Sequence, residues 1–144
     1  MIVGVASDHR GYRLKQELLS KMPSLVDYGT NSDESTDYPI YAFLIGEAIK
    51  EKKIDFGILI CGSGIGMSIA CNKVKGVRCA KISNKEEAIY TRNDNDANVL
   101  AISENHSVEE AIEMINNFIN TPFSTEEKYV RRLNEILDYE ERNA

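Results

Sequence analysis

The stretch that decides the fold reads Phe56-Gly57-Ile58-Leu59-Ile60-Cys61-Gly62-Ser63-Gly64-Ile65-Gly66. Its first five residues form a continuous apolar run, which is typical of a central strand buried on both faces of a parallel sheet. The glycine-rich residues that follow predict a turn, and a helix is predicted from Ile65 to Asn72. A strand, a turn and a helix in this order indicate an α/β protein.

The same alternation continues in both directions along the chain. Apolar segments predict four more strands, at residues 2–6, 25–28, 77–81 and 98–102. Apolar residues at helical spacing predict further helices, which lie after residue 11, over 39–49, 85–90 and 108–119, and around 130–137. Strands that alternate with helices predict a parallel sheet with right-handed crossovers. We therefore expect one three-layer α/β/α sandwich with a five-stranded parallel sheet and a C-terminal helix, in a single domain spanning residues 1–144.

Composition and charge narrow the class of function. The net charge of −6 argues against nucleic acid as a partner, although a local cluster of donors can still bind an anionic small molecule. The apolar runs are too short for a membrane span and no secretory signal is seen, so we expect a cytoplasmic protein without a membrane partner. Three cysteines without C-x-x-C spacing and only two histidines argue against a disulfide framework or a zinc site.

Three polar clusters mark where chemistry is expected. They are Asp8-His9 after the first strand, Cys61 to Gly66 after the third, and Asn93 to Asn98 around the fifth. Ligands of open parallel sheets bind at the carboxyl ends of the strands. We therefore expect all three clusters to open on the same edge of the sheet.

Cys61 stands at the end of a strand and just before a helix. Backbone N–H groups and the helix dipole at such a position favour a thiolate. Gly62, Gly64 and Gly66 let the backbone approach a ligand and turn several N–H groups toward a phosphate or an oxyanion. Two simpler interpretations stay open, because a cysteine here can be a small packing residue and the glycines can serve only a tight turn.

Several familiar motifs do not fit this loop. It lacks the Lys-Ser/Thr of a phosphate-binding P-loop, and Gly-x-Gly-x-Gly is not the dinucleotide pattern G-x-G-x-x-G. No arginine follows Cys61 to close a cysteine-phosphatase loop, and the spacing of a G-x-S-x-G elbow is wrong. Elsewhere, Asp8 can cap the first helix as well as bind a ligand. Lys128 and Arg132 share a helix face and can hold one phosphate.

In their order along the chain, these motifs resemble those of the family of ribose-5-phosphate isomerase B and galactose-6-phosphate isomerase. The resemblance spans Ile2 to Ile136. It rests on Ser7-Asp8-His9-x-Gly11, Gly29-Thr30, Asp37-Tyr38-Pro39, residues 60–70, Asn72-Lys73 and Asn95-Asp96-Ala97-Asn98-Val99-Leu100-Ala101. It implies a Rossmann-like sandwich that binds no nucleotide, needs no metal or other cofactor, and forms a homodimer or homotetramer with sites at the subunit interface.

The resemblance also implies the reaction and the residues that perform it. An aldose phosphate, such as ribose 5-phosphate or a related pentose or hexose phosphate, would be converted to the ketose phosphate through a cis-enediolate. Cys61 would be the base, with Ser63 beside it, and Asp94 would stand at the ring-opening position. The implied substrate-binding residues are Asp8, His9, Gly62, Ser63, Gly64, Ile65, Gly66, Asn95, Lys128 and Arg132, of which the last two would come from the neighbouring subunit.

Three positions depart from the family pattern. Asp94 replaces the usual ring-opening histidine, Asn105 replaces an arginine, and Lys128 replaces another arginine. We therefore predict that the preferred sugar, or its ring form, differs from ribose 5-phosphate. The alternatives are a non-catalytic sugar-phosphate binder, one subunit of a two-chain galactose-6-phosphate isomerase, and a nucleotide-binding regulatory domain that rests on the fold alone.

Overall fold

The computed structural model describes residues 1–143, which form one sheet of five strands and six helices. The strands are β1 (Val3–Ser7), β2 (Val26–Asp27), β3 (Phe56–Cys61), β4 (Cys79–Lys81) and β5 (Val99–Ser103). The helices are α1 (Tyr12–Lys21), α2 (Tyr38–Lys50), α3 (Ile65–Cys71), α4 (Lys85–Asn95), α5 (Val108–Asn120) and α6 (Glu127–Arg142). The order of elements predicted from the sequence is confirmed. β2 is shorter than predicted because only two of its residues pair with β1.

All strand pairs are parallel, in the order β2-β1-β3-β5-β4. The chain leaves β1 toward β2 and returns past β1 to β3, so the strand order reverses between β1 and β3. In open parallel sheets the binding crevice lies outside the carboxyl ends of the strands at such a switch point. The topology therefore points to the loops after β1 and β3.

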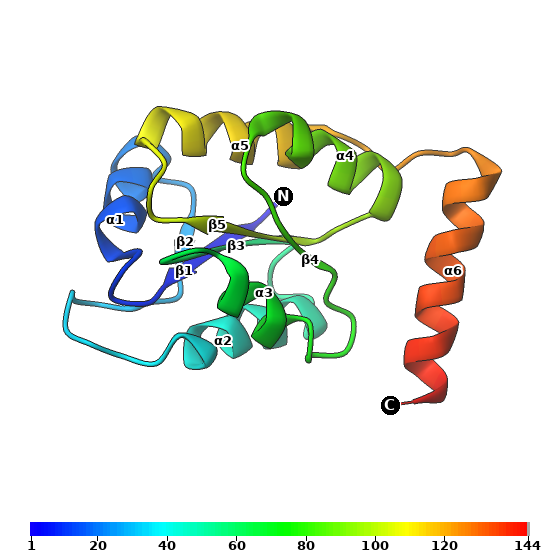
Figure 1. Ribbon diagram of the computed structural model, residues 1–144, viewed down its shortest axis with the longest axis horizontal. Coiled ribbons are helices and arrows are strands. Elements are labelled where there is room, and N and C mark those ends of the chain that lie inside the picture. Colours follow the sequence, from blue (N-terminus) through cyan, green and yellow to red (C-terminus); the bar gives the residue numbers. More distant parts are fainter. Residues whose placement is uncertain (144) are drawn as a thin grey trace.

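Helices cover both faces of the sheet (Figure 1). On one face, α1, α4 and α5 build an apolar core that includes Leu18 and Phe118. On the other face, α2 and α3 build a second core that includes Ile45 and Met67. Because Ile58 and its neighbours in β3 are covered from both sides, this strand reads as an uninterrupted apolar run in the sequence.

Helix α6 stands beside the sandwich rather than on it (Figure 1). None of its side chains is buried, and Val130, Ile136, Leu137 and Tyr139 are exposed apolar residues on it. An amphipathic helix without a covered face is marginal by itself in water. The apolar side of α6 is therefore available for a contact outside the described residues. Within residues 1–143, no helix is both long and apolar enough to cross a membrane.

Candidate active site

Backbone and side-chain hydrogen bonds join the loops that follow β1, β3 and β5. The Asp8 N–H donates to the carbonyl of Ile60 at 3.3 Å, and the Glu104 N–H donates to the carbonyl of Cys61 at 2.9 Å. The Ser103 hydroxyl donates to the carbonyl of Gly62 at 2.7 Å. Two of the three predicted polar clusters, Asp8-His9 and residues 61–66, therefore do lie together at the carboxyl edge of the sheet.

Cys61 is the last residue of β3, and only 5% of its surface is exposed. Its Sγ accepts the backbone N–H of Gly64 at 3.2 Å. A hydrogen bond of this kind stabilises negative charge on sulfur more than it stabilises the neutral thiol. The surrounding side chains, among them Ala6, Met67 and Ala101, are apolar. A buried sulfur that faces a backbone donor is suited to accept a proton and to return it.

Gly64 sets the shape of the turn after Cys61. Its φ of 83° is left-handed, and a side-chain carbon there would lie 3.0 Å from the backbone carbonyl carbon of Ile102. Only glycine meets both conditions without strain. Ser63 is exposed, and its hydroxyl accepts the N–H of Ile65 at 3.1 Å. The turn thus starts α3 directly behind the sulfur and keeps backbone donors beside it.

Asp8 and His9 hold the neighbouring loop in a defined geometry. One oxygen of the buried Asp8 accepts the N–H groups of Arg10 at 3.0 Å and Gly11 at 3.1 Å. Asp8 therefore fixes the turn before α1, although the N-cap position itself is Gly11. The Nδ1 atom of His9 accepts the N–H of Thr36 at 3.2 Å. A neutral imidazole bound in this way carries its proton on Nε2, which can donate to a substrate oxygen.

Arg10 and Glu104 also belong to this edge, and the sequence reasoning missed both. Arg10 Nε lies 2.6 Å from Glu104 Oε2. Glu104 directly follows β5, so the strand-end rule would have found it if it had been applied to the end of β5. Arg10 occupies the unspecified position x of the Asp8-His9-x-Gly11 motif. The motif therefore predicts nothing about the residue at this position.

The expectation that Asn93 to Asn98 open on the same edge is wrong. These residues precede β5, whose register pairs Gly57 with Val99 and Cys61 with Ser103. They therefore lie at the amino edge of the sheet. Four residue steps along β5 separate the two edges, which is about 13 Å at the usual rise of a parallel strand.

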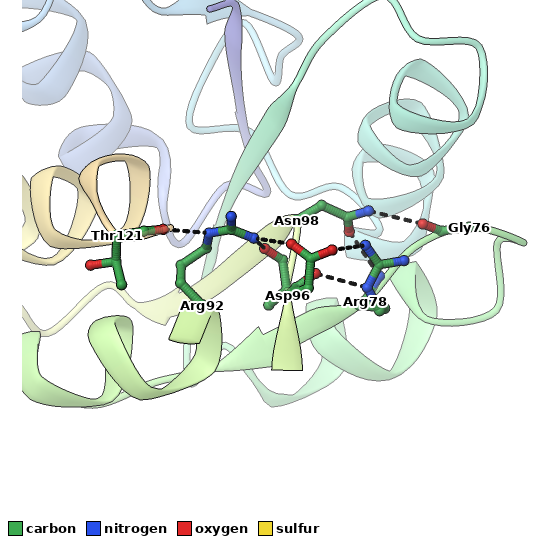
Figure 2. Close-up of polar contacts among 7 residues, drawn as sticks. Gly76, Arg78, Arg92, Asp96, Asn98 and Thr121 are labelled. Atoms are coloured by element: carbon green, nitrogen blue, oxygen red, sulfur yellow. Dashed lines mark hydrogen bonds and ion pairs between the residues drawn. The ribbon is translucent and has the colours of Figure 1, made fainter. Parts of the chain in front are cut away.

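An ion-pair network fixes the turn at the amino edge (Figure 2). Asp96, which has a left-handed φ of 51°, lies between two arginines. Arg92 Nη1 donates to Asp96 Oδ1 at 2.6 Å, and Arg78 Nη2 donates to Asp96 Oδ2 at 3.3 Å. Arg92 also donates to the carbonyls of Ala97 and Thr121. This network fixes the backbone that directly follows Asp94 and Asn95.

Asp94 and Asn95 share a cavity of about 160 Å³ with residues of α6. Arg132 and Tyr129 are among its lining side chains. Asp94 Oδ1 also accepts the side-chain amide of Asn93 at 2.7 Å. Lys128 is exposed, with its Nζ 5.0 Å from the ring centre of Tyr129. The predicted site residues therefore form two groups on opposite edges of the same chain.

Within residues 1–143, no group of three or more His, Cys, Asp and Glu side chains is arranged to hold a metal ion. The polar groups at the carboxyl edge are hydrogen-bond donors, the thiol of Cys61 and the carboxylates of Asp8 and Glu104. This arrangement is chemically suited to proton transfer on an anionic substrate.

Comparison with known proteins gives consistent matches. The model of the Ribose/Galactose Isomerase family matches residues 3–136. The chain belongs to this family. It is 42% identical to YwlF of Bacillus subtilis (strain 168) over 99% of both chains. Ribose-5-phosphate isomerase B of Clostridium thermocellum superposes with a TM-score of 0.94 at 35% identity, and the match covers all of both chains. A Mycoplasma genitalium ribose-5-phosphate isomerase B, solved with bound ribulose-5-phosphate, gives 0.90 at 36% identity and covers 96% of this chain and 95% of that one.

The family match confirms the family predicted from the sequence, and the superposed structures confirm the fold class and the isomerase class. The roles of individual residues stay predictions. What the structure adds for this family member is their placement, with Asp8, His9 and residues 61–66 on one edge and Asp94, Asn95 and Arg132 on the other.

Proposed function

We propose that this chain interconverts an aldose phosphate and a ketose phosphate, with ribose 5-phosphate and ribulose 5-phosphate as the first pair to test. The proposal rests mainly on the buried sulfur of Cys61, which accepts a hydrogen bond from the N–H of Gly64. This sulfur lies at the switch point of the sheet. Relatives across the whole chain carry the name ribose-5-phosphate isomerase B, and one was solved with ribulose-5-phosphate bound.

In the proposed mechanism, the Cys61 thiolate removes the proton from the carbon next to the substrate carbonyl. The C–H electron pair becomes the carbon–carbon double bond of a cis-enediolate, and the negative charge moves to oxygen. Backbone N–H groups of residues 62–66 stabilise that oxygen, as preorganised donors do for developing oxyanions. The hydroxyl proton on that carbon passes to the oxygen of the former carbonyl. The thiol returns its proton to the former carbonyl carbon, so the neighbouring carbon becomes the new carbonyl and the reaction consumes no redox partner. His9 Nε2 donates to a sugar oxygen.

The complete site requires two copies of the chain. Asp94 and Asn95 precede β5 at the amino edge, and Lys128 and Arg132 lie on α6, whereas Cys61 ends β3 at the carboxyl edge. Two exposed apolar surfaces offer the means of association. One is on α6, and the other, on α2 and α3, consists of Ile40, Phe43, Leu44, Ile65 and Ile69. Exposed apolar surfaces of this kind mark protein interfaces. We therefore place Cys61 of one copy opposite Asp94 and Arg132 of another, in a homodimer or a larger assembly.

A screen of the purified chain against five- and six-carbon aldose and ketose phosphates tests the function. We expect turnover of at least one pair, followed by proton NMR of both sugars. Binding of sugar phosphates without any turnover would contradict the proposal. It would favour the alternative of a non-catalytic binder or of one subunit of a two-chain isomerase, for which the aspartate at the ring-opening position, Asp94, is the supporting observation.

A further inference from the structure

Arg10 presents a guanidinium group at the carboxyl edge that the proposed mechanism does not use. Its Nε lies 2.6 Å from Glu104 Oε2, and 60% of its side chain is exposed. The backbone position of Arg10 is set by Asp8, which accepts the Arg10 N–H, and not by the arginine side chain. A charged side chain on a rigid loop, with most of its surface open, is available to a ligand.

The guanidinium lies directly over the glycine turn. A side-chain carbon placed on Gly62 would be 3.7 Å from both Cζ and Nη1 of Arg10. The Gly62 carbonyl is held by the hydroxyl of Ser103. Arg10 therefore stands beside the residue that immediately follows Cys61, at the mouth of the site.

Glu104 holds Arg10 in this position without using all of its donors. Nε lies close to the carboxylate but not in hydrogen-bond geometry, because Glu104 Oε2 has no hydrogen-bond partner among residues 1–143. An arginine carries five N–H donors in a planar fork. The Glu104 N–H is bonded to the carbonyl of Cys61, so the backbone of Glu104 is anchored to the end of β3. The remaining donors of Arg10, on Nη1 and Nη2, suit a phosphate, which arginine binds through two parallel hydrogen bonds.

We infer that Arg10 is a phosphate-binding residue of this site, positioned by Glu104. The inference rests on the proposed function for the identity of the sugar, but not for the binding of phosphate. Arg10 would supply a cation from the same chain as Cys61, in addition to the cations on α6.

The test measures two quantities on Arg10→Ala, namely KM for the sugar phosphate and the dissociation constant of inorganic phosphate. Because a charge-assisted bond to phosphate is lost in both the ground state and the transition state, we expect both constants to rise by about tenfold while kcat changes little. Arg10→Lys should recover part of the affinity, since lysine keeps the charge but not the fork.

Arg13→Ala is the matched control, because Arg13, in the first turn of α1, is likewise an exposed arginine paired with a glutamate, Glu17. It should leave both constants unchanged. Arg10→Ala also leaves Glu104 unpaired, and its charge would repel phosphate. The double variant Arg10→Ala/Glu104→Gln removes that repulsion, so a residual loss of affinity in it reports the missing cation.

Unchanged KM and phosphate affinity in Arg10→Ala, as in Arg13→Ala, would overturn the inference while leaving the isomerase intact. Full recovery of phosphate affinity in the double variant would also overturn it, because repulsion by Glu104 would then explain the loss. If the wild-type chain isomerises no sugar but Arg10→Ala still weakens inorganic phosphate binding, and the double variant remains weakened, the inference stands and the proposed function falls. Calorimetry with inorganic phosphate measures this affinity independently of turnover.

Discussion

Asp94 stands where the family pattern has a histidine, so its role is the prediction that is most specific to this chain. Its carboxylate accepts the amide of Asn93 and lines a cavity with Arg132. A carboxylate placed here can move a proton between ring oxygen and hydroxyl, as general acid–base groups do.

Asp94→Asn keeps the shape of the side chain but cannot exchange a proton. We predict that kcat for the ring-closed sugar falls by about a hundredfold, a typical contribution of a general acid–base group. Asp94→His should restore turnover. Steady-state kinetics measure kcat for both variants. Undiminished turnover in Asp94→Asn would show that Asp94 takes no part in ring opening.

Among the three cysteines, the structure separates Cys61 from Cys79. A hydrogen bond with Cys71, together with burial, raises the pKa of the Cys79 thiol well above its ordinary value. The thiolate is the form that reacts with alkylating agents, so Cys79 should react slowly near neutral pH.

We therefore predict that iodoacetamide at pH 7.5 modifies Cys79 more slowly than Cys61, and that the substrate protects Cys61 alone. Peptide mass spectrometry with and without ribose 5-phosphate measures both rates. Substrate protection of Cys79 with Cys61 left unprotected would place the site elsewhere.

At the scale of elements, the turn from β3 into α3 depends on Gly64. Alanine at this position would meet a left-handed φ and the backbone of Ile102 at 3.0 Å. Gly76 offers a matched control, since it also has a positive φ, 89°, but nothing lies within 4 Å of an added carbon.

We predict that Gly76→Ala lowers the free energy of unfolding by about 1 kcal/mol through the left-handed backbone alone. Gly64→Ala should cost more, about 2–4 kcal/mol, because overpacking is added. It should also lower kcat, since the N–H of Gly64 bonds Cys61. Urea unfolding and kinetics measure both effects. Equal stability losses in the two variants would contradict the crowding argument.

The turn between α4 and β5 depends on Asp96 in a comparable way. Removing this carboxylate leaves Arg92 largely buried without its charge partner. Unpartnered charges of this kind are costly even where backbone carbonyls remain as acceptors.

We predict that Asp96→Ala lowers the free energy of unfolding by about 2 kcal/mol. Lys53→Ala, which breaks an exposed pair with Glu51, should leave the urea midpoint unchanged. An unchanged midpoint in Asp96→Ala would show that the network in Figure 2 contributes nothing to stability.

Across the whole molecule, the sequence predicted the layers, the strand count and the position of Asp8, His9 and residues 61–66 at the carboxyl edge. The apolar run over 56–60 and the helical spacing of leucines and isoleucines report burial directly, which is the property that fixes the layers. The edge predicted for Asn93–Asn98 was wrong because a cluster around the fifth strand was expected at its carboxyl end, although these residues precede β5. Glu104 directly follows β5 and could have been found by the strand-end rule. Arg10 could not, because its pairing with Glu104 depends on the strand order, which local sequence does not contain.

The two-edge arrangement gives a prediction for the assembled protein. Cys61→Ala and Asp94→Ala should each be nearly inactive alone. When the two variants are unfolded and refolded together, random dimers should contain sites in which an intact Cys61 faces an intact Asp94, and about a quarter of wild-type activity should return. A mixture that stays inactive would contradict sites shared between copies.

The central claim is that Cys61 moves the carbon-bound proton, and exchange in D2O tests it most directly. Deuterium incorporation at C2 of the aldose phosphate is followed by NMR with the wild-type chain and with Cys61→Ser, while calorimetry checks that inorganic phosphate still binds. The account predicts exchange in the wild-type chain and its loss in Cys61→Ser with phosphate affinity retained. Exchange at the wild-type rate in Cys61→Ser would contradict it.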